Sequence, residues 1–303
     1  MRRWHTDAWV AAAEVSDRPQ LWVAGGLAWA CTVGPLALLV AVVPAPNVSD
    51  LTFLGARMFV AAVWPWNAVA AVALAGLVVL LGLWLLSIAD VAVLAHRAGA
   101  PSGSAARAFG VTVVAAIPVL VVAGATALAL ARIAPAEFTA PDTADGGPVL
   151  RTLLGIAPLL GVLLATGLIA GAYAAAARVL LVDRGASLRG ALSGAIPALA
   201  VARPASAVHS VVAAAARLAY LGVATLMLGV LWAPIREQLG TGAGFGAVQA
   251  ALLVGFVAIW LCLVLGGGAL HAWGSVSWTR ILAVRSPSIA RGDALSRETP
   301  STP

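Results

Sequence analysis

Six long apolar segments constrain the fold of this chain more than any other feature of its sequence. Each has about the 20 residues that an α-helix needs to cross the hydrocarbon core of a bilayer. Because lipid offers the backbone no hydrogen-bond partners, segments of this kind are helical. We therefore predict an all-α, polytopic integral membrane protein with six transmembrane helices, over residues 21–43, 67–88, 108–131, 153–173, 217–236 and 248–268.

The composition excludes an ordinary water-soluble domain. Hydrophobic residues make up 62% of the 303 residues and charged residues only 10%, whereas soluble domains carry about 25% charged residues. The net charge is +6, but the arginines gather at the ends of the apolar segments and form no basic stripe on a soluble module. We therefore expect the lipid bilayer, and not nucleic acid, as a partner.

The basic residues predict an orientation in the membrane. All eighteen are arginine, and four of them, Arg57, Arg132, Arg151 and Arg236, fall on one side of the predicted spans, with the other fourteen on the opposite side. Arginine is enriched on the cytoplasmic side of membrane proteins. We therefore predict a multi-pass protein of the plasma membrane with both termini in the cytoplasm.

The chain is predicted to have three parts. Residues 1–20 should form an interfacial N-terminal helix, and residues 21–283 the six-span transmembrane domain. Within this domain, a cytoplasmic connecting helix is expected over about 184–203. Residues 284–303 are polar and contain proline, which predicts a disordered cytoplasmic tail.

The segment 178–204 separates the fourth and fifth predicted spans. Ser187 is a suitable N-cap for a helix that we expect to end before Pro197. Two interpretations of this helix stay open. It presents Ser187, Arg189 and Ser193 to a cytoplasmic or membrane protein partner, or it only fills space among lipid headgroups.

Arg18 and Pro19 begin the first span, and Asp, Arg, Gly, Ala and Ser form the turn 183–187 before a short helix. In these features and in its layout the chain resembles a group of prokaryotic six-helix membrane domains. The best-named member is the membrane domain attached to some glycerophosphoryl diester phosphodiesterases. The resemblance implies a six-span fold. We do not expect the phosphodiesterase activity, because the 303 residues contain no soluble domain of that kind.

Asp90 is the acidic residue that lies deepest in an apolar segment. Intramembrane carboxylates commonly mark functional sites such as proton relays. Arg97, however, follows about two helical turns later, and Arg178 and Arg184 are predicted on the same side of the membrane. We therefore predict a structural ion pair near the interface, in which Arg178 or Arg184 is the partner of Asp90.

Several chemistries lack the residues that they require. The chain has no lysine, which excludes a P-loop and Schiff-base catalysis. His209 and His271 are expected near the cytoplasmic interface without partnering carboxylates, which is a poor basis for a metal site. We predict no catalytic, cofactor-binding or metal-binding residue.

Small residues four positions apart predict close contacts between helices. Gly167 and Gly171 in the fourth span, and Ala251 and Gly255 in the sixth, are expected to let neighbouring helices approach.

Three classes of function remain. We favour a non-catalytic membrane protein that scaffolds or regulates a partner through its cytoplasmic face. The alternative is a transporter or permease subunit for a small molecule, supported by possible broken helices at Pro35, Pro118 and Pro158. Against it, the predicted span interiors offer few polar groups beyond four threonines. An intramembrane or lipid-modifying enzyme would need an acid–base set that the sequence does not show.

Overall fold

The chain folds into a bundle of long helices. The computed structural model describes residues 2–43, 66–98, 103–139, 147–240 and 246–283, which are helical apart from caps and turns. The predicted tail, 284–303, lies outside the described residues. In chain order the helices are α1 (Arg2–Ser16), α2 (Pro19–Thr32), α3 (Gly34–Val42), α5 (Trp66–Ala98), α6 (Ser104–Thr139), α7 (Pro148–Val182), α8 (Leu188–Val201), α9 (Arg203–Gly240) and α10 (Ala247–Ala283).

Five of these helices, α5, α6, α7, α9 and α10, are long and apolar enough to cross a membrane. Helices α2 and α3 pass the same test together, although they are bent by 54° where they meet. The protein is therefore a multi-pass membrane protein, and its described residues contain five candidate spans, or six when the bent pair is one span. The five long helices have 33 to 38 residues, well above the roughly 20 that a bilayer requires.

Prolines act differently in the different helices. Near the bend predicted at Pro35, α2 ends at Thr32 and α3 begins at Gly34. Pro35 is in the first turn of α3, where a missing N–H costs little, so it begins a second helix. Pro118 and Pro158, in contrast, lie inside the continuous helices α6 and α7. The expected breaks at these two positions were wrong.

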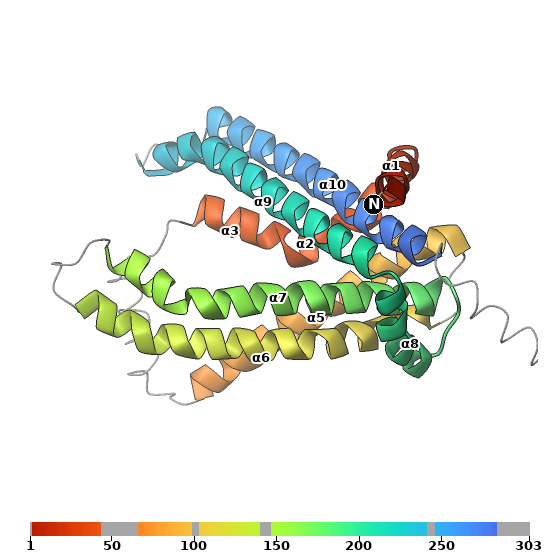
Figure 1. Cartoon of the computed structure of the whole chain (residues 1–303). Helices are drawn as coiled ribbons and strands as arrows, with labels where there is room; N and C mark the ends of the chain where they lie inside the picture. Colours follow the sequence, from red (N-terminus) through yellow and green to blue (C-terminus); the bar gives the residue numbers. More distant parts are fainter. Residues whose placement is uncertain (1, 44–65, 99–102, 140–146, 241–245, 284–303) are drawn as a thin grey trace, which may run out of the picture.

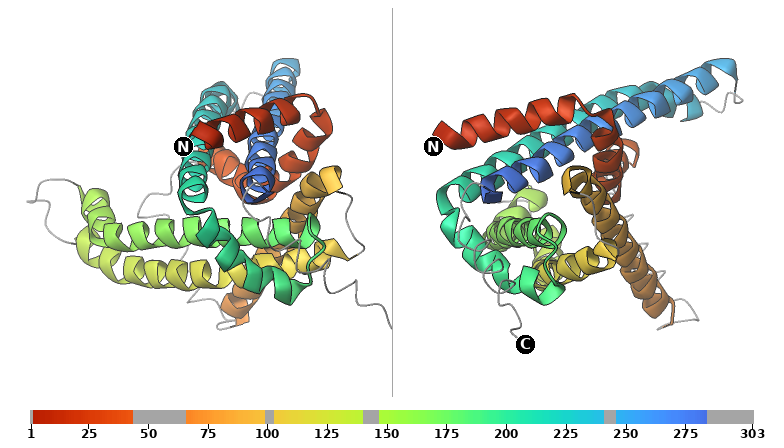
Figure 2. Two further views of the ribbon diagram at one scale, coloured as in Figure 1. Left: turned by 45° about the vertical axis from the view of Figure 1, so that its right-hand side comes forward. Right: turned by 90° about the vertical axis from the view of Figure 1, so that its right-hand side faces the viewer.

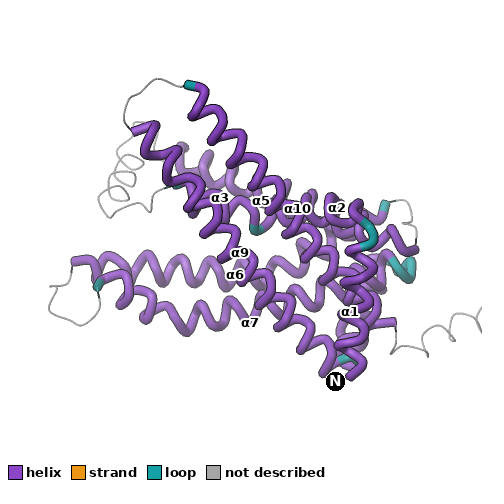
Figure 3. Tube along the Cα trace, turned by 90° about the horizontal axis from the view of Figure 1, so that it is seen from above, coloured by secondary structure: helices purple, strands orange, loops and turns teal. Residues whose placement is uncertain are grey.

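The helices form two groups. Helices α6, α7 and α8 pack together, and α1, α2, α3, α9 and α10 form the other group, with α5 between α2 and α6. The pairs α6–α7 and α9–α10 come together at one end of the bundle and diverge towards the other (Figures 1 and 3). We name the closed end, where α7 and α10 end and α8 lies, the α8 end.

The closed α8 end contains the largest buried core. Leu181 and Val182 of α7 pack there with Ile281 and Leu282 of α10. Away from this end, leucine and valine side chains cover the outer surfaces, as at residues 77–81 of α5. A continuous apolar surface of this kind is suited to contact with lipid.

The N-terminal helix is attached to the α8 end. Helix α1 lies across α10 (Figure 2), where the indole N–H of Trp273 donates to the Ala8 carbonyl at 3.0 Å. Arg280 of α10 also donates to Glu14 at 2.7 Å. Ala11 is fully buried on the face between these contacts. Helix α1 is thus packed on the bundle by two specific polar contacts.

The connecting helix α8 starts as predicted but ends later. The Ser187 hydroxyl oxygen accepts a hydrogen bond from the Gly190 N–H at 3.1 Å, which confirms the N-cap. The helix then continues through Pro197 to Val201, so the prediction that it ends before Pro197 was wrong. Proline removes only one helical hydrogen bond, and packing compensates: the buried positions of α8 are Ala191, Ala195 and Ala198.

The glycines that bring two helices into close contact are not the ones that the sequence predicted. Gly167, Gly171 and Gly255 have open space where a Cβ would stand, so the predicted packing role was wrong. Instead, Gly25 of α2 and Gly268 of α10 bring the two backbones together. A Cβ on either would overlap the backbone of the opposite helix. The α2–α10 crossing therefore requires glycine at these positions.

Replacement of Gly268 by alanine should destabilise the protein. Its Cβ would overlap backbone atoms of Gly26 and Trp22, which cannot move away as a flexible side chain can. We expect Gly268→Ala to lower the free energy of unfolding by about 1–3 kcal/mol, measured as a lower thermal midpoint in detergent. The matched control is Gly255→Ala on the same helix, where a Cβ meets open space. Equal midpoints for the two variants would contradict this account of the crossing.

Candidate functional site

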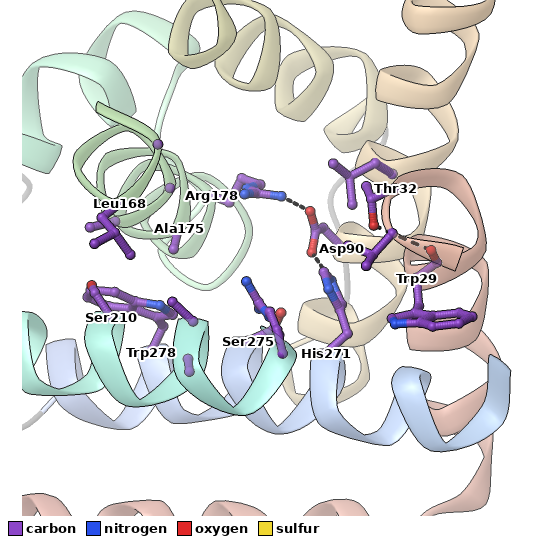
Figure 4. A pocket seen from close by; sticks show the side chains of 18 of the residues that line it. Trp29, Thr32, Asp90, Leu168, Ala175, Arg178, Ser210, His271, Ser275 and Trp278 are labelled. Carbon is purple, nitrogen blue, oxygen red and sulfur yellow. Dashed lines mark hydrogen bonds and ion pairs between the residues drawn. The ribbon is translucent and has the colours of Figure 1, made fainter. Parts of the chain in front are cut away.

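A cavity of about 290 Å³ lies inside the bundle, with walls from α2, α5, α7, α9 and α10 (Figure 4). On α7 the wall is made largely of small residues, among them Gly171 and Ala175, and on α9 of Ala213 and Ala214. These short side chains leave the space open. Four longer side chains that can carry charge also line the cavity: Asp90, Arg178, Arg217 and His271.

Asp90 and Arg178 form an ion pair in the cavity wall (Figure 4). Their side chains are only 4% and 14% exposed. Of the arginines considered as partners for Asp90, the structure thus brings Arg178 to it. Arg184 donates instead to the Leu282 carbonyl at 3.1 Å. Arg97 is on α5, seven residues after Asp90, and its side chain is outside the described residues.

His271 also binds Asp90. Its Nε2 lies 2.8 Å from Asp90 Oδ1. Because an ionised carboxylate only accepts hydrogen bonds, this Nε2 carries the proton. The expectation that His271 lacks a carboxylate partner was wrong. The predicted sixth span ended at 268, whereas α10 continues to Ala283 and carries His271 into the bundle. In the sequence, Gly266, Gly267 and Gly268 mark the end of the apolar segment, although they do not end the helix.

Arg217 lines the cavity from α9, although the residue as a whole is exposed. The sequence suggested that the fifth span begins there, but α9 begins at Arg203, about 21 Å of helix earlier. The Arg217 guanidinium lies against Gly274 of α10, where a Cβ would come within 3.0 Å of Nη2. No carboxylate of the described residues lies within ion-pair distance of Arg217.

His209 has a packing role next to this cavity. Its ring is fully buried and contacts the rings of Trp273 and Trp278 at centroid distances of 5.4 and 5.3 Å. Its Nε2 lies 3.2 Å from the Gly274 carbonyl. These contacts join α9 to α10, and the expected position of His209 near the cytoplasmic interface stays a prediction.

The residues proposed to face a partner are all on the surface of α8. Ser187, Arg189 and Ser193 are exposed. They do not line the cavity. The structure therefore separates two candidate surfaces: the outer side of α8 and the charged interior.

Neither a group of metal ligands among the described residues nor a similarity to known proteins assigns a function to this site. Among the residues that the structure describes, no group of three or more His, Cys, Asp or Glu side chains is placed to hold a metal ion. Comparisons with protein-family models, with curated proteins and with solved structures find no match. The resemblance to six-helix membrane domains therefore stays a prediction.

The cavity carries more positive than negative charge. Two arginines, Arg178 and Arg217, line it with one carboxylate, that of Asp90. An unpaired charged side chain in a membrane-spanning helix is costly. Asp90 offsets this cost for Arg178 but not for Arg217. Together with the hydroxyl of Ser275 in the wall, the arrangement is suited to a small anion.

The Asp90–Arg178 pair can be tested by a reciprocal exchange. Asp90→Arg and Arg178→Asp should each lower the free energy of unfolding by about 3 kcal/mol or more, because each leaves like charges facing one another in a buried site. The double exchange should recover part of this loss. Purely additive losses in detergent unfolding would show that the two side chains do not interact.

The control for this exchange is the ion pair of Arg151 with Glu137. Their atoms are 2.8 Å apart, but the Glu137 side chain is 32% exposed. We expect Glu137→Ala to cost at most about 1 kcal/mol. A loss as large as that of Asp90→Arg would mean that burial does not determine the effect.

Proposed function

We propose that this protein is a transporter or permease subunit for a small anion that binds in the cavity. The observation that carries this proposal is Arg217, a guanidinium inside a membrane-spanning helix, lining a cavity without a carboxylate partner among the described residues. Intramembrane charges usually mark substrate or ion pathways. The sequence favoured a scaffold because the span interiors appeared to lack polar groups, and the cavity provides them.

The broken helix supports the same proposal. Trp29 and Thr32 at the end of α2, and Val33 at the break, line the cavity. In many transporters, substrate sites lie where a membrane helix is interrupted. A break is also a position where a few residues can absorb the change in backbone angles during opening and closing.

We further propose that the α8 end faces the cytoplasm, with the bent pair α2–α3 as one of six spans. The arginines support this orientation. Arg184, Arg189 and Arg203 lie at the α8 end, whereas Arg132 and Arg236 lie towards the ends of α6 and α9 at the opposite side. Enrichment of arginine on the cytoplasmic side would then place both termini in the cytoplasm.

A second candidate function is the docking of a protein partner on α8. It is favoured by the exposure of Ser187, Arg189 and Ser193 on the outer side of this helix. This function is compatible with the first, since permease subunits commonly assemble with others. Purification in mild detergent distinguishes the cases, because a scaffold should retain a stoichiometric partner.

Replacement of Arg217 should weaken anion binding without unfolding the protein. The probes are labelled inorganic phosphate and labelled succinate, with binding measured on purified protein and uptake in proteoliposomes. We expect saturable binding of at least one probe, weakened at least tenfold by Arg217→Gln, which corresponds to about 1.4 kcal/mol. The control is Arg189→Gln, an arginine on α8 that does not line the cavity. Equal binding by the two variants, or no binding by the wild type, would contradict the proposal.

A further inference from the structure

A second hollow lies beside the charged cavity. It is a groove of about 1060 Å³ with walls from α6, α7, α8 and α9. Its lining includes Ile169, Ile196 and Val211, whose side chains are 72%, 67% and 58% exposed. Two of these residues, Ile169 and Val211, are on helices long enough to cross a membrane, where exposed apolar side chains are suited to contact with lipid. Its volume is slightly above the range of about 300–1,000 Å³ that is typical of pockets for drug-sized ligands.

The groove and the cavity share part of their walls. Leu168 and Ala172 of α7 and Ser210 of α9 line both. Two of these three side chains are small. The groove is therefore next to the charged interior, across a thin part of the wall between α7 and α9.

One face of α9 carries polar residues along both spaces, although the hydroxyls of Ser206 and Ser210 donate to carbonyls of the same helix. Arg203, Ser206, Ser210 and Arg217 follow at spacings of three, four and seven residues, which place them on the same side of a helix. The first three line the groove, and Ser210 and Arg217 line the cavity. Arg203 is exposed at the first position of α9, at the α8 end.

We propose that the ligand of this protein is an anionic lipid with a phosphate headgroup, which enters from the bilayer between α7 and α9. Its phosphate would pass from Arg203 along this face to Arg217 and Arg178, while its acyl chain stays in the apolar groove. Arginine binds phosphate through paired, charge-assisted hydrogen bonds. This inference rests on the proposed function, because it requires that the cavity binds an anion.

The exposed apolar lining of the groove favours this source of the phosphate over a soluble one. A soluble anion needs only the charged cavity and gains nothing from an apolar groove in its wall. A lipid gains from both, since its chain remains in an apolar environment while its headgroup meets the two arginines.

The test uses the full-length protein in nanodiscs of phosphatidylcholine, with empty nanodiscs as the background. Three labelled probes are compared: inorganic phosphate, butyl phosphate and hexadecyl phosphate. We expect hexadecyl phosphate to bind at least tenfold more tightly than butyl phosphate. Arg217→Gln should weaken the binding of all three probes.

Variants that fill the groove distinguish binding of the acyl chain from binding of the phosphate headgroup. Ala207→Trp on α9 and Ala200→Trp on α8 each introduce a large ring into the groove lining. Either should reduce the binding of hexadecyl phosphate at least fivefold and leave that of inorganic phosphate unchanged. Ala219→Trp, at an exposed position of α9 outside both linings, is the matched control and should change neither.

Each other outcome overturns a specific claim. Equal binding of the butyl and hexadecyl probes, with no effect of a filled groove, overturns the lipid inference and leaves the anion site intact. Hexadecyl binding that is insensitive to Arg217→Gln shows a lipid that stays in the groove, which also overturns the inference. No binding of any probe by the wild type overturns the proposed function itself.

Discussion

The contact of Asp90 with Arg178 and His271 is the interaction on which the rest of this structure depends. It joins α5, α7 and α10, and thus the two groups of helices, at the closed end of the bundle. Both oxygens of Asp90 are used, one by each partner. The carboxylate neutralises only one arginine, so Arg217 lines the same cavity without a carboxylate partner among the described residues, and we propose that it attracts an anion.

Much of the fold was predictable because it follows from the hydropathy of successive segments along the chain. The apolar segments indicated a multi-pass helical protein, and Ser187 correctly marked the start of α8. The ends of the helices were not predictable in this way. Hydropathy reports the apolar part of a span, whereas α9 and α10 extend well beyond it, because packing at the α8 end continues them.

The site was only partly predictable, and for the same reason. Asp90 was conspicuous as a carboxylate within an apolar segment, and arginine was the expected partner. Arg217 and His271 were assigned to the interface because they flank apolar segments, although their helices carry them into the cavity. The α2–α10 crossing at Gly25 and Gly268 depends on the relative position of two distant helices, which spacing within one helix cannot show.

The central claim is that an anion binds between Arg178 and Arg217. Crystals soaked with tungstate, a tetrahedral dianion like phosphate, would test it most directly through the anomalous scattering of tungsten. The account predicts a peak inside the cavity, between the guanidinium groups of these two arginines. Tungsten peaks confined to surface arginines such as Arg189, with none inside the cavity, would contradict it.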